Sequence, residues 1–257
     1  MHIVFIVGSY HPNYCAVGKC VGNVANELAQ NHKVTIICEK SYLKQQNEET
    51  YNNQKILRII TSDKFKREKL IEHVEKAKGI KKLFFSTLLN MLKLHQVSKL
   101  VFSKTSIKNE LVNTYLSKIR EIEERIDVII PASMPFESVI AAHNFKNKFN
   151  SEVLLLPYLF DQFVENEALH RFKYNKNLKM KAHQNIEREI VYNADKIFIM
   201  RQLYVYYTSV YPEYSHLFLE VEHPLIVKNN IRPVSMIKGN IVFTYAGGFY
   251  KNIREPK

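Results

Sequence analysis

Short apolar runs alternate with amphipathic stretches along the chain, and this alternation limits the possible folds more than any other feature. Ile3–Val7 is a continuous apolar run that ends at Gly8, as in a strand buried on both faces. Cys20–Gln30 then places its apolar residues on one helical face, and Val34–Cys38 is a second apolar run. A strand, a helix and a strand in this order predict a parallel βαβ unit.

The alternation continues with one helical interruption. Between residues 64 and 125 no strand-like run occurs and Gly79 is almost the only helix breaker, so we predict an insertion of three helices there. Further helices are predicted at Phe136–Phe149, started by Pro135, and at roughly 165–193. Further strands are predicted at Ile56–Thr61, Val128–Pro131, Val153–Leu156, Lys196–Met200 and Leu217–Val221. The predicted fold class is α/β, with a Rossmann-like doubly wound parallel sheet.

A strand followed by glycines begins again near the C-terminus. Ile241–Tyr245 is apolar and leads into Gly247 and Gly248, but few residues remain to give this strand a partner. We therefore predict a Rossmann-like domain at 1–223, which contains the helical insertion at about 64–125. A linker at 224–239 and the beginning of a truncated second domain at 240–257 are predicted to follow it.

The net charge and the cysteines indicate which classes of partner and which cellular compartment to expect. The net charge of +12 favours phosphate-rich partners, which include nucleic acid, nucleotides and an anionic membrane surface. Cys15, Cys20 and Cys38 form no CxxC pair, and no secretion signal precedes the first strand, so we predict reduced thiols in the cytoplasm. The stretch Leu83–Leu94 is too short to span a bilayer.

The loops after the strands are the candidate binding sites, because doubly wound sheets bind ligands at the carboxyl ends of their strands. In the loop Ser9–Lys19, Gly18 and Lys19 are candidate phosphate-binding residues before a predicted helix start, or else part of an ordinary glycine turn. Ser133 is a candidate for binding a ligand hydroxyl, or for capping the next helix. Tyr158 and Asp161 suit a sugar, although Asp161 could also cap a helix.

A fourth loop combines glycines with cations. Gly247 and Gly248 allow close backbone approach, and Lys251 and Arg254 supply positive charge, so the loop suits a diphosphate. The alternative is an ordinary turn with charges near a chain end. No metal is expected, because the aspartates form no DxD pair and the histidines and cysteines lack zinc-ligand spacing.

Two further sets of charges were weighed. Glu187 and Glu189 lie two apart on a helix and are interpreted as solvated charges on different faces. The basic helices at 64–108 combine lysines with apolar residues, which suits an anionic membrane surface or, alternatively, helix faces that pack on a core. No nucleic-acid motif accompanies the positive charge, so no specific nucleic-acid partner is predicted.

Several segments together resemble the N-terminal domain of family-4-type glycosyltransferases, which have the GT-B fold. The opening from His2 to Pro12, Gly18, and the segment 24–37 are similar to that family's first strand, glycine loop and following helix and strand. Residues 126–130, the segment Glu187–Asp195, and residues 243–250 are similar to its later landmarks. The resemblance spans essentially the whole chain, but Ala132 and Ser133 stand where many members have a histidine.

The resemblance implies transfer of a sugar from a nucleotide-diphosphate donor to a saccharide or lipid-linked acceptor, usually without a metal, in the synthesis of a surface polysaccharide. It implies that Gly18 lies near the donor phosphate or the acceptor, and that Asp161 lies beside the reacting sugar. It also implies that Gly247, Gly248, Lys251 and Arg254 begin the diphosphate site. The basic helices at 64–108 are predicted to attach such an enzyme to the inner face of the membrane. The alternatives are a non-catalytic α/β binding module, an inactive remnant of such an enzyme, and a nucleic-acid binder.

Overall fold

The computed structural model describes residues 1–166, 169 and 173–224. They lie within Met1–Ile226, one of two units into which contacts divide the chain. The predicted strand Ile241–Tyr245, the loop with Gly247, Gly248, Lys251 and Arg254, and the predicted linker beyond Pro224 lie outside the described residues.

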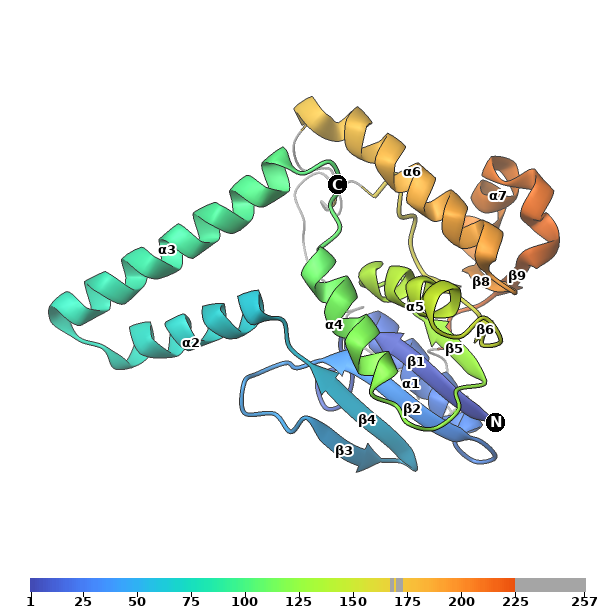
Figure 1. The fold of residues 1–257 in the computed structure, drawn as a ribbon, viewed down its shortest axis with the longest axis horizontal. Helices are drawn as coiled ribbons and strands as arrows, with labels where there is room; N and C mark the ends of the chain where they lie inside the picture. Colours follow the sequence, from blue (N-terminus) through green and yellow to red (C-terminus); the bar gives the residue numbers. More distant parts are fainter. Residues whose placement is uncertain (167–168, 170–172, 225–257) are drawn as a thin grey trace, which may run out of the picture. The chain divides into compact units, whose positions relative to one another are not determined.

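Two sheets of mainly parallel strands form the centre of the described unit (Figure 1). One sheet has the order β3-β4-β2-β1-β5-β6, in which only β3 is antiparallel, and the other has the order β7-β8-β9. The strands are β1 (His2–Val7), β2 (Lys33–Glu39), β3 (Glu48–Tyr51), β4 (Gln54–Ile59), β5 (Val128–Pro131), β6 (Leu154–Leu155), β7 (Tyr158–Leu159), β8 (Ile197–Met200) and β9 (Phe218–Val221).

The two sheets continue into each other where β6 ends and β7 begins. Ala132 forms a parallel bridge to Tyr158, and Ser133 N donates to Tyr158 O at 2.9 Å. Pro157 lies between β6 and β7 and has no N–H for a sheet hydrogen bond. If β6 and β7 count as one interrupted strand, the parallel strands lie in the order third, second, first, fourth, fifth, sixth and seventh along the chain. This order confirms the predicted Rossmann-like doubly wound sheet.

Helices cover both faces of the sheet. In β1, Val4 and Ile6 pack in a core with α4 and α5, whereas Phe5 and Val7 pack in a second core with α1, α6 and α7. Both faces of a parallel strand are buried in this way when crossover helices lie on both sides. The helices are α1 (Ala16–Leu28), α2 (Ser62–Lys76), α3 (Gly79–Phe102), α4 (Asn109–Arg120), α5 (Glu137–Lys148), α6 (Lys176–Asn193) and α7 (Arg201–Val210). Two 3-10 turns, Lys173–Asn175 and Pro212–Leu217, accompany them.

Three helices occupy the predicted helical segment 64–125, but they pack differently. The first two, α2 and α3, pack against each other as a helical hairpin (Figure 1). In contrast, α4 buries Leu111, Tyr115 and Ile119 against the sheet and forms part of the central core. Among the described helices, none combines the length and the apolar character needed to cross a membrane.

The first helix begins earlier than predicted. It starts at Ala16 rather than at Cys20, because the Cys15 Sγ accepts a hydrogen bond from Gly18 N at 3.3 Å and caps the helix. Gly18 and Lys19 are therefore in the first turns of α1 and not in the loop before it. The helix α7 lies between two predicted strands, in a segment for which the sequence predicts no element.

The hairpin of β3 and β4 was also missed. Asn52 and Asn53 both have positive φ angles, 49° and 60°, and connect the two strands in a two-residue turn. Asparagine tolerates this left-handed conformation better than most residues, and such turns match the twist of the strands they join. The Asn52-Asn53 pair was thus the overlooked sequence signal.

The interpretation of Glu187 as a solvated charge is wrong, whereas Glu189 is exposed as predicted. Glu187 is 1% exposed and accepts hydrogen bonds from the hydroxyls of Tyr207 and Tyr211, each at 2.9 Å. Burial raises its pKa from 4.5 to about 7. Spacing along α6 separated the two glutamates correctly, but it could not show that α7 would cover one of them.

Candidate functional site

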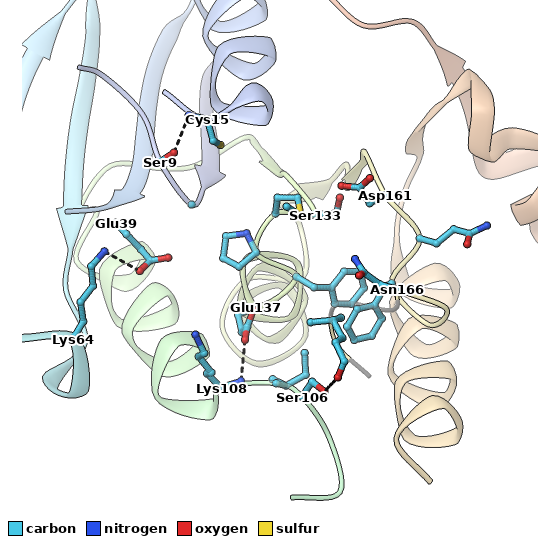
Figure 2. A pocket seen from close by; sticks show the side chains of 18 of the residues that line it. Ser9, Cys15, Glu39, Lys64, Ser106, Lys108, Ser133, Glu137, Asp161 and Asn166 are labelled. Atoms are coloured by element: carbon cyan, nitrogen blue, oxygen red, sulfur yellow. Dashed lines mark hydrogen bonds and ion pairs between the residues drawn. The ribbon is translucent and has the colours of Figure 1, made fainter. Parts of the chain in front are cut away.

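A cavity of about 490 Å³ lies at the carboxyl ends of the central strands. In the sheet order, the chain reverses direction between β1 and β5, and the loops after these two strands diverge there. The loops after β1, β2, β5 and β7 form its walls, and residues before α4 close its base (Figure 2). We call this space the switch-point cavity; its polar lining residues include Ser9, Cys15, Glu39, Lys40, Lys64, Ser106, Lys108, Ser133, Glu137, Asp161 and Asn166.

Close backbone contact holds the loops after β1 and β5 together. Gly8 N donates to Met134 O at 3.0 Å. A Cβ on Gly8 would lie 2.8 Å from Pro135 Cδ and 3.1 Å from Met134 O, so only glycine allows this approach without displacement. The two loops are therefore held together in one wall of the cavity.

Glu137 contributes a buried carboxyl group to the cavity. It is the first residue of α5, is 7% exposed, and its Oε1 accepts from Lys108 N at 2.9 Å. Burial raises the pKa of this carboxyl, although the hydrogen bond from Lys108 N opposes the shift. Glu137 can therefore accept a hydrogen bond from a ligand hydroxyl when ionised, or donate one when protonated.

Ser133 and Asp161 lie beside each other on the same wall (Figure 2). The Ser133 hydroxyl accepts from Phe160 N at 2.9 Å, so it ties the loop after β5 to the loop after β7. The capping interpretation of Ser133 is wrong, because α5 has no side-chain cap and begins at Glu137. Asp161 is exposed, and no described helix begins there, so its carboxylate does not cap a helix.

Cations and aromatic rings complete the lining. Lys64 Nζ donates to Lys40 O at 2.6 Å and lies 3.5 Å from Glu39 Oε2, which fixes the start of α2 against the loop after β2. Phe136 and Phe163 stack with their ring centroids 3.6 Å apart. The cavity thus combines three acidic side chains, lysines and an aromatic surface, a lining that suits a hydroxyl-rich ligand with an apolar face.

The structure brings together only some of the residues predicted for the site. Ser133 and Asp161 line the switch-point cavity, whereas Gly18, Lys19 and Tyr158 do not. Gly18 is buried, and Lys19 Nζ lies 5.4 Å from the centroid of the Tyr14 ring. The Tyr158 ring packs in the core, 4.2 Å from the Phe160 centroid. The roles predicted for these residues stay predictions.

Sequence reasoning missed Glu39, Lys64, Lys108 and Glu137. Glu137 follows β5 closely enough that the rule about carboxyl ends could have found it. Lys64 reaches the cavity from the first turn of α2 and Lys108 from the position before α4, and no local motif indicates that arrangement. Among the described residues, no group of three histidine, cysteine or acidic side chains could hold a metal ion.

The described residues thus define a doubly wound α/β domain with a polar cavity at its switch point. Comparisons of the sequence with models of known protein families and with curated proteins found no match. Comparison of the structure with solved structures found glycosyltransferases of the GT-B class, the class that the sequence resembles.

Three of these structures illustrate the similarity. A sucrose-phosphate synthase from Thermosynechococcus elongatus matches with a TM-score of 0.49 and 11% identity, over 86% of this chain and 47% of that chain. An alpha,alpha-trehalose-phosphate synthase (UDP-forming) from Burkholderia vietnamiensis matches with a TM-score of 0.40 and 9% identity, over 77% and 39%. An alpha-glucosyltransferase in complex with UDP matches with a TM-score of 0.37 and 13% identity, over 82% and 39%. The chain spans less than half the length of each.

Proposed function

We propose that this chain is the acceptor-side domain of a glycosyltransferase. The enzyme transfers a sugar from a nucleotide-diphosphate donor to a saccharide or lipid-linked acceptor, in the synthesis of a surface polysaccharide. The observation that carries the proposal is the switch-point cavity, because its carboxylates and stacked phenylalanines suit a sugar at the place where this sheet topology binds ligands.

In this proposal the cavity residues divide the work of binding and proton transfer. In the reaction, an acceptor oxygen bonds to the anomeric carbon, the bond to the diphosphate breaks and the nucleoside diphosphate leaves, and the acceptor hydroxyl passes its proton to the carboxylate of Asp161. Asp161, exposed at the cavity wall, accepts a hydrogen bond from a hydroxyl of the reacting sugar or acceptor. Glu137 and Ser133 orient the acceptor, and Phe136 covers its apolar face.

The donor's diphosphate is assigned to residues outside the described part of the chain. Gly247, Gly248, Lys251 and Arg254 are proposed to bind it, Gly18 and Lys19 are separately proposed as phosphate-binding residues, and no metal is assigned a role. Three lysines of the described domain, Lys40, Lys64 and Lys108, line the switch-point cavity and supply positive charge beside the acceptor.

The test is release of nucleotide from a donor in the presence of an acceptor. The protein, produced from its complete reading frame, is incubated with UDP-, GDP- and dTDP-sugars and with saccharide and prenyl-linked acceptors, and free nucleoside diphosphate is measured. We expect release with at least one pair of donor and acceptor.

Asp161→Asn is expected to lower kcat on the order of 100-fold, the usual cost of losing a proton-accepting group. Glu137→Gln is expected to raise the acceptor KM about tenfold, because the neutral amide makes a weaker hydrogen bond to the acceptor hydroxyl. The amide has the same shape and keeps the hydrogen bond from Lys108 N, so the local structure is retained.

Glu213→Gln is the matched control, since Glu213 is exposed in a 3-10 turn and does not line the cavity. If the folded protein releases no nucleotide from any donor, the non-catalytic binding module is the correct interpretation. If Asp161→Asn and Glu213→Gln behave alike, Asp161 has no part in the reaction.

We propose further that the protein is cytoplasmic and binds the anionic inner face of the membrane through α3. One side of α3 packs against α2, whereas the other presents large apolar side chains to solvent at helical spacing. Lysines flank this apolar stripe, among them Lys78, Lys81 and Lys82, which gives the amphipathic, basic character that anionic bilayers attract. The stripe consists of Ile80, Leu83, Phe84, Leu88, Met91 and Leu94.

Sedimentation with vesicles tests the membrane proposal. We expect the protein to bind phosphatidylglycerol-containing vesicles, and the double substitution Leu83→Ser and Met91→Ser to weaken that binding at least tenfold, because both side chains are exposed and apolar. Val205→Ser is the control, since Val205 is equally exposed on α7. Equal binding of all three proteins would mean that α3 does not contact the lipid.

A further inference from the structure

A second, larger cavity adjoins the switch-point cavity. It has a volume of about 1050 Å³ and lies between the α2–α3 hairpin and the start of α4. The two cavities share Glu39, Lys64 and the segment 106–108 in their linings, so a ligand can extend from one into the other. We call this second space the hairpin groove.

Positive charge in the hairpin groove exceeds the negative charge available to neutralise it. Five cations, Lys64, Arg67, Lys93, Lys99 and Lys108, line the groove, against three acids, Glu39, Asp63 and Glu110. Two of the acids are engaged already. Glu110 Oε1 accepts from Ser62 N at 2.6 Å and from Asp63 N at 3.3 Å, and Glu39 lies beside Lys64.

Three of the lysines have no carboxylate partner among the described residues. Arg67 pairs with Glu68 at 3.2 Å, but Lys93, Lys99 and Lys108 form no ion pair with any acid in the described part of the chain. Ammonium groups gathered in one concave space repel each other, and an anion bound among them relieves that repulsion. Phosphate oxygens are strong acceptors for such groups.

The rest of the groove lining restricts the kind of anion. Hydroxyl-bearing residues Thr105 and Ser103 lie between the lysines, and the apolar side chains of Val97, Leu100 and Ile107 line the same space. A small inorganic anion would leave this apolar surface in water. A phosphate group attached to a larger organic body covers it.

We infer that the hairpin groove binds a phosphate or diphosphate group carried by the acceptor, while the acceptor's reacting hydroxyl lies in the switch-point cavity. The inference rests on the proposed function in treating the ligand as the acceptor. The phosphate belongs either to a lipid-linked acceptor or to a phosphorylated soluble one, and the groove recognises the same group in both.

Titration calorimetry at fixed ionic strength tests the inference with three probes: inorganic pyrophosphate, geranyl diphosphate and geraniol. We compare the parent protein with the double variant Lys93→Gln and Lys99→Gln. The control is the double variant Lys148→Gln and Lys181→Gln, which removes the same charge from exposed helix positions outside both cavities. We expect the groove variant to bind both diphosphates about 100-fold more weakly, about tenfold for each lysine lost, and the control to stay within threefold of the parent.

The two diphosphate probes distinguish the sources of the phosphate. Geranyl diphosphate that binds at least tenfold more tightly than pyrophosphate supports the groove with a lipid-linked acceptor, and equal affinities support it with a soluble phosphorylated acceptor. Equal weakening in both double variants overturns the inference, because the attraction is then nonspecific. The inference is also overturned if neither pyrophosphate nor geranyl diphosphate binds saturably.

The same titrations in saturating UDP separate this inference from the proposed function. UDP occupies any donor site, so diphosphate binding that persists in UDP and depends on Lys93 and Lys99 is binding to the groove. If the protein binds no UDP and releases no nucleotide, the proposed glycosyltransferase function is wrong. Diphosphate binding that still depends on Lys93 and Lys99 would then identify the hairpin groove as a site for an organic phosphate.

Discussion

Replacing Gly18 with alanine is expected to lower the free energy of unfolding by roughly 3 kcal/mol, a cost typical of overpacking that the main chain must relieve. A Cβ on Gly18 would lie 2.1 Å from Ser9 O and 3.2 Å from Ser9 C. Both atoms belong to the backbone, so no side-chain rotation can remove the overlap. The loop after β1 must move away from α1, and that loop carries Ser9 and Cys15 in the wall of the switch-point cavity.

Gly22→Ala provides the matched control for this substitution. Gly22 lies one turn further along α1, and its added Cβ would meet only side-chain atoms, the nearest being Tyr14 Cε1 at 3.3 Å and Tyr10 Cε2 at 3.4 Å. Alanine gains about 1 kcal/mol of helix propensity over glycine, which offsets that tight contact. Urea unfolding followed by circular dichroism measures both variants. If Gly18→Ala is as stable as Gly22→Ala, Ser9 does not pack on α1 as described.

Replacing Glu187 with glutamine is expected to remove a large part of the pH dependence of stability. The pKa of Glu187 is about 7 in the folded protein, and its ordinary value is 4.5. Between these values the folded protein keeps the proton and the unfolded chain does not, so this contribution is full below pH 4.5 and is lost as pH rises to about 7. The parent should therefore lose roughly 2 to 3 kcal/mol from this group between about pH 5 and pH 8, and Glu187→Gln should not.

The groups around Glu187 set this behaviour. Burial is the main cause of the raised pKa; hydrogen bonds from Tyr207 and Tyr211 oppose it, and the charge of Glu165 adds to it. Glutamine retains an acceptor for one tyrosine hydroxyl and a donor for the other. Urea unfolding at pH 5, 6, 7 and 8 gives the comparison, with the exposed Glu213→Gln as control. Parallel stability profiles for the parent and Glu187→Gln would show that Glu187 titrates near its ordinary pKa in the folded protein.

The apolar periodicity was sufficient for most of the architecture. The runs at 3–7, 34–38 and 128–131 became β1, β2 and β5, because a strand buried on both faces needs an uninterrupted apolar sequence. The rule about carboxyl ends also directed attention to the loops that carry Ser133 and Asp161. Local signals located both residues near the cavity that the fold later formed.

The departures from prediction share a physical reason. The hydroxyl of Ser133 bonds to Phe160 N rather than to its own helix, and Tyr158 turns its ring into the core. Glu137 is buried because Lys108 N approaches it from the chain before α4. Each outcome depends on a contact with a residue that is distant in sequence, and the apolar periodicity does not show which distant residue makes that contact.

The sequence by itself determined the doubly wound α/β class, the three helices after β4 and the surplus of positive charge, since each of these follows from local pattern or composition. Only the tertiary structure decided that Glu187 is buried under α7, that Glu137 lies in a cavity, and that Lys64, Lys93, Lys99 and Lys108 line one groove. Burial and clustering are properties of the packed chain, because the elements that cover or face a side chain come from remote segments.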